Sequence, residues 1–267
     1  MGIFPKRWGD PRVRRRLRHP SENTYLVSCV VFSLLTVVGA LSRLLSGDPN
    51  EPLILLSIPA LVFFVRGHHY ARQRVNGVRV TEKQFPEAHR MVREAAARFK
   101  MSRIPEAYVV LGNGVINAFA SGHGFRRYVA INSDLFEVGG RLADPDALRF
   151  VIGHEVGHIA AGHTSFWRQF GISVANVVPG VGSTLSRAQE YTADNHGHTF
   201  CSEGRHGLRV LAAGKYLYPQ VDFRDIAERA RTDTGFFVLL VNLFSSHPIN
   251  TFRFAALDNR SRPGRVL

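Results

Sequence analysis

The sequence predicts an α+β protein, mostly helical, in which a domain with a small sheet follows an N-terminal transmembrane helical hairpin. Three observations support this class. Two apolar runs lie within residues 24–66, helix-like patterns interrupted by short strand-like runs fill residues 67–267, and this second part contains a histidine-rich stretch with helical spacing. The apolar fraction of 45% is ordinary for a folded chain, so wholesale disorder is excluded.

The chain begins with a basic segment. Its 267 residues have a formal net charge of +13, with 30 arginines and 4 lysines, and a surplus of this size indicates nucleic acid or an anionic membrane surface. Within residues 1–20, Asp10 is the single acid. Because an apolar run follows directly, we interpret residues 1–23 as a basic cytoplasmic tail that contacts lipid headgroups, and we expect no nucleic-acid partner.

The first apolar run, "TYLVSCVVFSLLTVVGALSRLL", carries no charge before Arg43. About 20 apolar residues suffice for a helix to cross the bilayer core. A secretory signal peptide is the alternative, but the run is too long and lacks a convincing cleavage site. Cys29 lies inside this run, away from any oxidant, so a disulfide framework is not expected and a reducing compartment is favoured.

The second apolar run, residues 52–65, is short, and its length alone favours a buried or re-entrant segment. The positive-inside rule favours a second crossing, because basic residues flank both outer ends and an acidic turn lies between the runs. We therefore predict that residues 24–66 form a two-helix hairpin in the inner (plasma) membrane. The protein is then multi-pass, the lipid bilayer is a partner, and the remaining domain faces the cytoplasm.

Residues 67–267 are expected to form that cytoplasmic domain. Pro86 opens a stretch whose apolar residues recur at helical spacing, namely Ala88, Met91, Val92, Ala95 and Phe99. Strand-like runs at 106–113 and 127–136 bracket a glycine-containing segment. Asp144 and Pro145 are the expected N-cap and first residue of the next helix. Two further helices are expected at 183–200 and 207–218.

Two apolar segments of this domain permit alternatives. Residues 170–182, broken by Pro179 and glycines, form either a loop that dips toward the bilayer or a core connection. Residues 235–244 are too few to span a membrane, so they form either a core helix or a membrane-apposed segment.

The stretch "FVIGHEVGHIAAGH" contains a metal-binding pattern. Residues four apart share one face of a helix, so His154 and His158 can occupy two corners of a zinc tetrahedron. Glu155, beside them, can reach a metal-bound water and take its proton as general base. A buried helix that is rich in histidine by coincidence is the alternative, so the motif alone is only suggestive.

A third metal ligand is expected downstream of these two histidines. The extended pattern with a third histidine is excluded, because Ala161 and Thr164 occupy its glycine and histidine positions. The stretch "SRAQEYTADNHG" instead supplies Glu190, which would complete a His-His-Glu site with an open fourth position. Asp194, one turn later on the same face, can orient a ligand imidazole through a hydrogen bond.

We expect the other histidines to have structural or surface roles rather than to bind metal. His163 is rotated off the ligand face of a straight helix, so we interpret it as a structural or helix C-terminal residue rather than a fourth ligand. His196 and His198 are expected to be packing or surface residues. The adjacent pair His68 and His69 is expected at the membrane interface.

Together these motifs resemble a known family. "HEVGH", "EYTAD" and "SHPINTFR", in this order behind a membrane hairpin, are similar to the HtpX-type membrane zinc metallopeptidases, which are gluzincins related to the CAAX prenyl endopeptidases and a mitochondrial stress protease. "VINAFASG" matches the family's segment before an edge strand. The resemblance covers about residues 104–256 and the hairpin, and it implies a zincin-like metallopeptidase domain.

The resemblance implies a role for nine residues. One Zn²⁺ per chain would bind His154, His158 and Glu190, with Glu155 as the general base. His247 would stabilise the oxyanion of the tetrahedral intermediate. The remaining roles are orientation of a ligand histidine by Asp194, bracing of the His247 region by Arg253, and presentation of the substrate as an added strand by Asn117 and Ala118.

The chain departs from the pattern of this family in its membrane segments. HtpX carries further apolar segments between its two zinc motifs, whereas the interval from His158 to Glu190 leaves little room for a second hairpin. The prenyl-protein enzymes enclose a chamber with many more membrane helices. Prenylated substrates are therefore not expected.

Three functions follow as hypotheses. The first is a membrane-anchored zinc metalloendopeptidase that cleaves misfolded or membrane-associated polypeptides in protein quality control. The second is a non-catalytic membrane adaptor that retains the metallopeptidase fold, and the filled catalytic positions argue against it. The third is a membrane-tethered nucleic-acid binder, which is disfavoured because much of the positive charge flanks the hairpin. The oligomeric state stays open.

Overall fold

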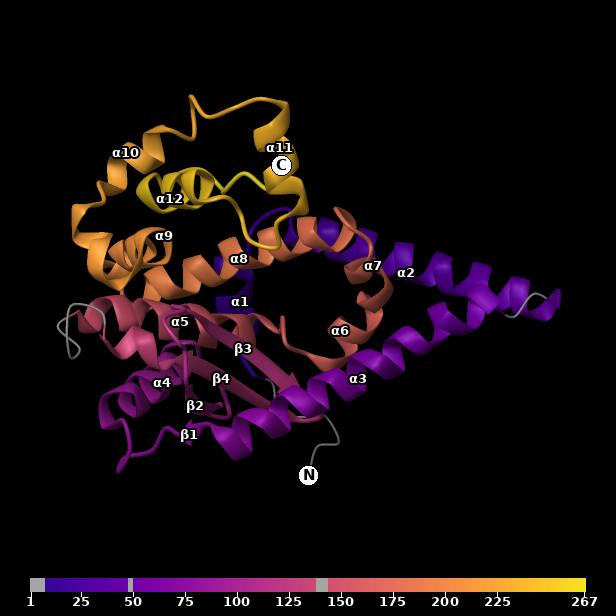
Figure 1. Ribbon diagram of the computed structural model, residues 1–267, viewed down its shortest axis with the longest axis horizontal. Helices are drawn as coiled ribbons and strands as arrows, with labels where there is room; N and C mark the ends of the chain where they lie inside the picture. The colour runs from indigo at the N-terminus through magenta and orange to yellow at the C-terminus, as the bar shows by residue number, and fades with distance from the viewer. Residues whose placement is uncertain (1–7, 48–49, 138–143) are drawn as a thin grey trace.

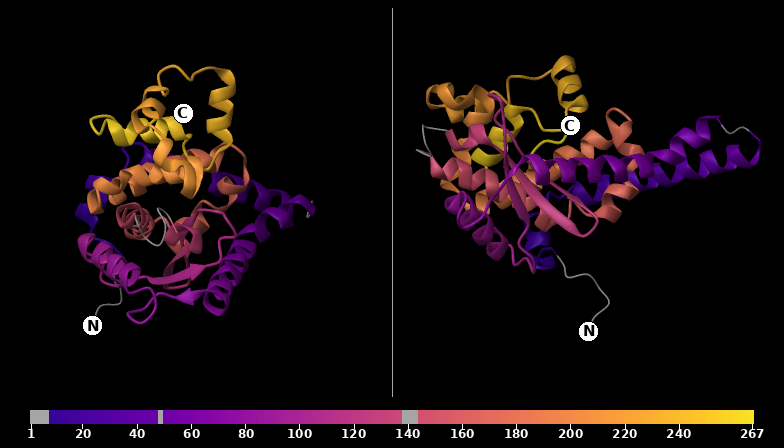
Figure 2. Two further views of the ribbon diagram at one scale, coloured as in Figure 1. Left: turned by 60° about the vertical axis from the view of Figure 1, so that its left-hand side comes forward. Right: turned by 60° about the horizontal axis from the view of Figure 1, so that its bottom comes forward.

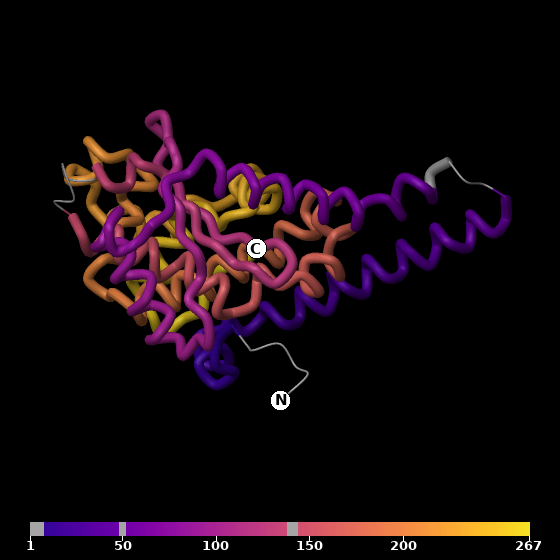
Figure 3. Tube along the Cα trace, turned by 90° about the horizontal axis from the view of Figure 1, so that it is seen from below, coloured from indigo at the N-terminus to yellow at the C-terminus, as the bar shows by residue number. Residues whose placement is uncertain are grey.

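The computed structural model describes residues 8–47, 50–137 and 144–267. After the short helix α1 (Pro11–Leu17), two long helices, α2 (Glu22–Leu45) and α3 (Asn50–Asn76), project from one side of a globular part (Figure 1). Seen from below, they meet at a tip far from that part (Figure 3). The expected fold class is confirmed: the described chain is mostly helical, with a small sheet behind two apolar helices.

The two hairpin helices are long and apolar enough to cross a membrane. They contain 24 and 27 residues, and at about 1.5 Å per residue each exceeds the bilayer core of about 30 Å. Their apolar side chains are widely exposed, Leu35 to 67% and Phe64 to 71%. A lipid bilayer would remove such an apolar surface from water.

The second apolar run is therefore not a short buried segment. It belongs to α3, which continues without interruption through Arg66, where we expected the hairpin to end, as far as Asn76. Parts of two predicted features, the basic tail (residues 1–7) and the polar turn between the runs (residues 48–49), lie outside the described residues.

The sheet has four strands in the order β1-β2-β4-β3. These are β1 (Val78–Arg79), β2 (Glu106–Val110), β3 (Ala118–His123) and β4 (Arg126–Asn132). The pair β2 and β4 is parallel, and the other two pairs are antiparallel. The two expected strand-like runs correspond to β2 and β4.

Strand β3, at the edge of the sheet, lies in the glycine-containing segment between the two strand-like runs, where the resemblance alone implied an edge strand. Its register pairs His123 with Arg126, so a two-residue turn joins β3 to β4. Gly124 occupies the first position of this turn with a φ of 54°, a conformation that glycine adopts without steric cost.

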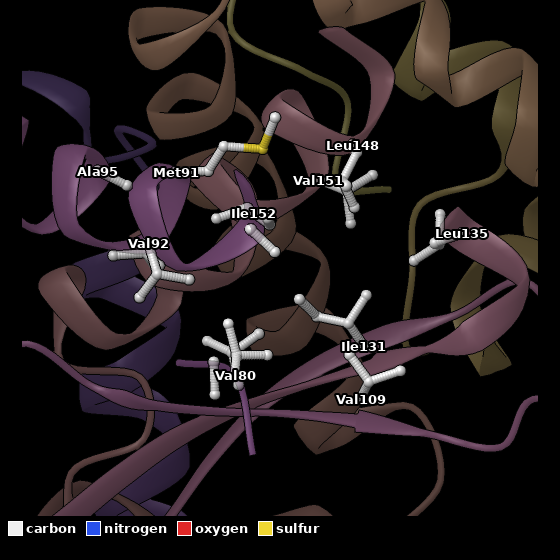
Figure 4. Close-up of a cluster of buried hydrophobic side chains, with 14 of the residues drawn as sticks. Val80, Met91, Val92, Ala95, Val109, Ile131, Leu135, Leu148, Val151 and Ile152 are labelled. Carbon is white, nitrogen blue, oxygen red and sulfur yellow. The ribbon is translucent and has the colours of Figure 1, made fainter. Parts of the chain in front are cut away.

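One face of the sheet is covered by α4 (Pro86–Arg98) and α5 (Pro145–Ala161). Met91 and Val92 from α4 pack with Ile152 from α5 onto Val109 and Ile131 of the strands (Figure 4). All five residues of the apolar face that we predicted after Pro86 are buried. The predicted cap is also present, since Asp144 accepts a hydrogen bond of 3.0 Å from the backbone N–H of Ala147.

The opposite face of the sheet is covered by α3, where Tyr70 packs against Tyr108 and Tyr128. Helix α5 thus lies between the sheet and α8 (Val181–Phe200), and α6 (Phe166–Gly171) and α7 (Ser173–Val177) connect the two helices. The remaining helices cover the far side of α8 (Figure 2), and they are α9 (Gly207–Leu217), α10 (Phe223–Glu228), α11 (Phe236–Phe244) and α12 (Asn250–Asp258).

The two apolar segments for which the sequence permitted alternatives have different environments. Ile172, between α6 and α7, and Ala175 of α7 are buried in one cluster with Cys29 of α2, so residues 170–182 include a core connection. Helix α11 instead exposes Phe237 to 78% and Val241 to 63%. The core-helix alternative is therefore wrong for residues 235–244, because a core helix would bury these side chains. A membrane-apposed segment stays a prediction.

Candidate metal centre

Two glycines allow α5 and α8 to approach closely. A Cβ atom on Gly157 would overlap the Cβ of His196, and one on Gly153 would meet the ring of Phe200. The two helices form the most extensive helix–helix contact in the described chain. The motif "HEVGH" therefore has a second property besides two histidines on one face. Its glycine allows α8, which carries Glu190, to lie close to those histidines.

We expect Gly157→Ala to disrupt this packing. Overpacking of a tight contact costs about 1–3 kcal/mol of the free energy of unfolding, and separation of the helices should also weaken metal binding. Thermal unfolding and metal content of the purified variant are the measurements. Gly39→Ala in α2 is the matched control, because no atom lies within 4 Å of the added Cβ. Equal stability of the two variants would contradict the prediction.

The structure brings the three predicted metal ligands together. Ligand atoms of His154, His158 and Glu190 lie within 4.8 Å of one another. The two Nε2 atoms are 3.2 Å apart. Nε2 of His154 lies 3.4 Å from Oε2 of Glu190, and Nε2 of His158 lies 3.4 Å from the other carboxylate oxygen, Oε1.

This geometry fits a tetrahedral cation. Two histidine nitrogens about 2.0–2.1 Å from zinc at tetrahedral angles are about 3.3–3.4 Å apart, close to the observed 3.2 Å, and the Glu190 carboxylate faces both nitrogens. The two facing Nε2 atoms converge on the space beside the carboxylate, and the buried Oε2 of Glu190 has no hydrogen-bond partner. A cation would satisfy both features at once.

The electrostatics of the site also favour positive charge. Burial opposes a charged imidazole at His154, but the hydrogen bond to Asp194 and the nearby carboxylate of Glu190 outweigh it and raise the pKa of His154 to about 10. Burial likewise opposes a charged Glu190, but the nearby histidines, His158 first, hold the pKa of Glu190 well below its usual range. The carboxylate is therefore ionised and ready to bind a cation.

Asp194 and Arg253 form a buried pair behind His154. The Asp194 Oδ1 atom lies 2.9 Å from Nδ1 of His154, and Arg253 donates two hydrogen bonds of 2.7 Å to the same carboxylate. Burial raises the pKa of Asp194, but Arg253 overcomes this effect and holds that pKa at about 2. The carboxylate thus accepts the Nδ1 proton and directs Nε2 of His154 toward the site.

Arg253 differs from our expectation in its contacts. We expected it to brace the region of His247, but its guanidinium is buried on Asp194 and lies 3.9 Å from Glu190. The reason is the position of α12, which packs its buried face against the rest of the domain beside α8. Arg253 therefore supports the carboxylate that orients His154.

A cleft of 220 Å³ opens onto the ligand set, and the other predicted site residues line it, namely Glu155, His247, Asn117 and Ala118. The His247 side chain is 62% exposed, and its Nε2 lies 3.7 Å from Oε1 of Glu190. Ala118 is the first residue of the edge strand β3. The structure thus places all nine predicted residues in or directly behind one cleft, while their roles stay predictions.

Sequence reasoning missed one contact of the ligand set. His163 follows Gly162, which ends α5 with a φ of 84°, and this turn brings the Nδ1 atom of His163 to 2.8 Å from that of His158. Burial lowers the pKa of His163 to about 3, so its imidazole is neutral. Gly162 was the available signal, because a left-handed residue after a helix reverses the chain.

Comparison with known proteins assigns the family. The model of peptidase family M48 matches residues 82–168 and 164–261. Proteins named "Protease HtpX homolog" from Burkholderia mallei (strain SAVP1) and Burkholderia pseudomallei (strain K96243) are each 25% identical over 288 residues, which cover 91% of this chain and 97% of the relative. No solved structure gives a significant match. The resemblance is confirmed: the chain belongs to peptidase family M48 and is similar to HtpX-type membrane metallopeptidases.

Proposed function

We propose that the protein is a zinc metalloendopeptidase that is anchored in the inner membrane by its hairpin, with residues 67–267 facing the cytoplasm. One Zn²⁺ per chain would be held by His154, His158 and Glu190. The observation that carries the proposal is the convergence of the two Nε2 atoms on the Glu190 carboxylate, with Glu155 in the same cleft.

Zinc bound there would supply an acidic water at neutral pH and polarise the scissile carbonyl. Glu155 would accept a proton from the attacking water and deliver it to the leaving amine. His247, at the mouth of the cleft, would donate a hydrogen bond to the developing oxyanion. These roles use only groups that line the cleft.

Substrates would bind as extended polypeptides. Strand β3 lies at the sheet edge and begins at the cleft with Ala118, and Asn117 precedes it. An edge strand binds an extended segment through main-chain hydrogen bonds, and this mode tolerates many sequences. It suits misfolded or membrane-associated proteins, whose backbone is accessible, and the hairpin would keep the cleft near such substrates.

Metal content and proteolysis of the full chain in detergent test the proposal. Wild type should contain about one zinc per chain and degrade an unfolded protein such as casein, and His158→Ala should lose both properties. Little zinc in folded wild type after reconstitution would exclude the peptidase. Full zinc without proteolysis of any unfolded protein would favour the adaptor.

A further inference from the structure

The buried side chain Glu22 lies at the start of α2, the first membrane helix. It is fully buried, although an isolated carboxylate inside a protein is costly. Arg168 donates a hydrogen bond of 2.8 Å to its Oε1 atom, and Thr192 of α8 donates one to Oε2. A charge that is buried and paired in this way holds three elements, α2, α6 and α8, in one arrangement.

The same carboxylate approaches the metal centre through His163. Nε2 of His163 lies 3.4 Å from Oε1 of Glu22, and Nδ1 of His163 lies 2.8 Å from Nδ1 of the ligand His158. Since Nε2 of His158 faces the other ligands, its Nδ1 must carry the proton and donate it to His163. The remaining proton of the His163 ring then lies on Nε2, which faces Oε1 of Glu22 at 3.4 Å and has no other hydrogen-bond partner among the described residues.

We propose that His163 and Glu22 position the ligand His158, so that the first turn of the membrane hairpin is part of the metal centre. This proposal rests on the proposed metal site. The two ligand histidines would then have different supports: Asp194 orients His154 directly, whereas Glu22 orients His158 through an intervening imidazole. Hydrogen-bond partners behind metal-binding histidines set the tautomer and ring orientation of the ligand.

The second hairpin helix reinforces the arrangement. Arg66 of α3 donates a hydrogen bond of 3.1 Å to the backbone carbonyl of Thr164, the residue after His163, and another to the carbonyl of Gly122 in the edge strand. Both hairpin helices therefore contact the segment that directly follows the metal-binding helix. The hairpin thus has a positioning role in addition to anchoring.

Two measurements on the full chain in detergent test the proposal. Competition with a chelator gives the zinc affinity, and the absorption spectrum of bound Co²⁺ reports on the ligand geometry. We expect His163→Ala to weaken zinc binding about 10–100-fold and to change the Co²⁺ spectrum. His163→Gln, whose amide oxygen can accept the His158 proton, should recover most of the affinity. Glu22→Gln should weaken binding less than His163→Ala does.

Two matched controls separate positioning from stability. His89→Gln removes a partly exposed imidazole of α4, outside the cleft and the ligand set, and Glu106→Gln removes a carboxylate of β2 that is held by Tyr70 and Tyr108. Both controls should keep the wild-type zinc affinity, even if they unfold at lower temperature.

Zinc affinity and Co²⁺ spectra that match wild type in His163→Ala, or in Glu22→Gln if the alanine variant does not fold, would overturn the positioning role. Absence of metal from wild type would overturn the proposed function as well, so the two failures are distinguishable.

Discussion

Replacing Glu155 by Gln is expected to reduce peptide hydrolysis by about 10²–10⁴-fold, which is the contribution of a positioned general base. The amide keeps the size of the side chain but cannot accept a proton. Glu155 lines the cleft and lies outside the ligand set, so zinc content should stay at the wild-type level. Initial rates of casein degradation and metal analysis on the same preparation measure both quantities.

Glu228→Gln is the control for Glu155→Gln. Glu228 is an exposed glutamate at the end of α10, and its replacement removes one negative charge without touching the cleft. Its rate should equal that of wild type. A Glu155→Gln protein that is loaded with zinc and hydrolyses casein at the wild-type rate would show that another group is the base.

Asp194→Ala is expected to lower the free energy of unfolding by about 3–5 kcal/mol, because it leaves the buried guanidinium of Arg253 without its partner. It should also weaken zinc binding about 10–100-fold, since His154 loses the group that orients it. Chemical unfolding of the full chain in detergent and chelator competition are the measurements.

A double variant separates these two effects. Asp194→Ala combined with Arg253→Met removes both charges, and much of the lost stability should return because no unpaired charge remains buried. Zinc affinity should stay weak, since His154 still lacks its acceptor. If Asp194→Ala alone has the free energy of unfolding of wild type, the pair of Asp194 and Arg253 does not stabilise the fold as its burial indicates.

The pH dependence of the Asp194 contribution has a definite sign. The folded-state pKa of about 2 lies below the ordinary value of 3.8. The stabilisation is therefore complete above about pH 4, and it is lost as the pH falls toward about 2, where the folded protein also takes up the proton. Asp194→Ala should flatten this part of the stability profile of the metal-free protein.

Local patterns were sufficient to predict much of the fold. The buried face of α4, the Asp144 cap and the common face of His154 and His158 all follow from helical periodicity, which depends on residues within a few positions. The two apolar runs likewise predicted the hairpin helices. Local patterns did not predict strand β3, for which only the resemblance implied an edge strand, because its residues form a strand only by pairing with β4 across the turn at Gly124.

The sequence by itself determined which residues are suited to bind a metal, since the ligand types and their spacing are local properties of α5 and α8. Only the tertiary structure decided what supports them. The pairing of Arg253 with Asp194 and the path from Glu22 through His163 to His158 join residues far apart in the chain. These contacts depend on how closely α5, α8, α12 and the hairpin pack, and close packing at Gly157 rather than local periodicity brings the first two of these helices together.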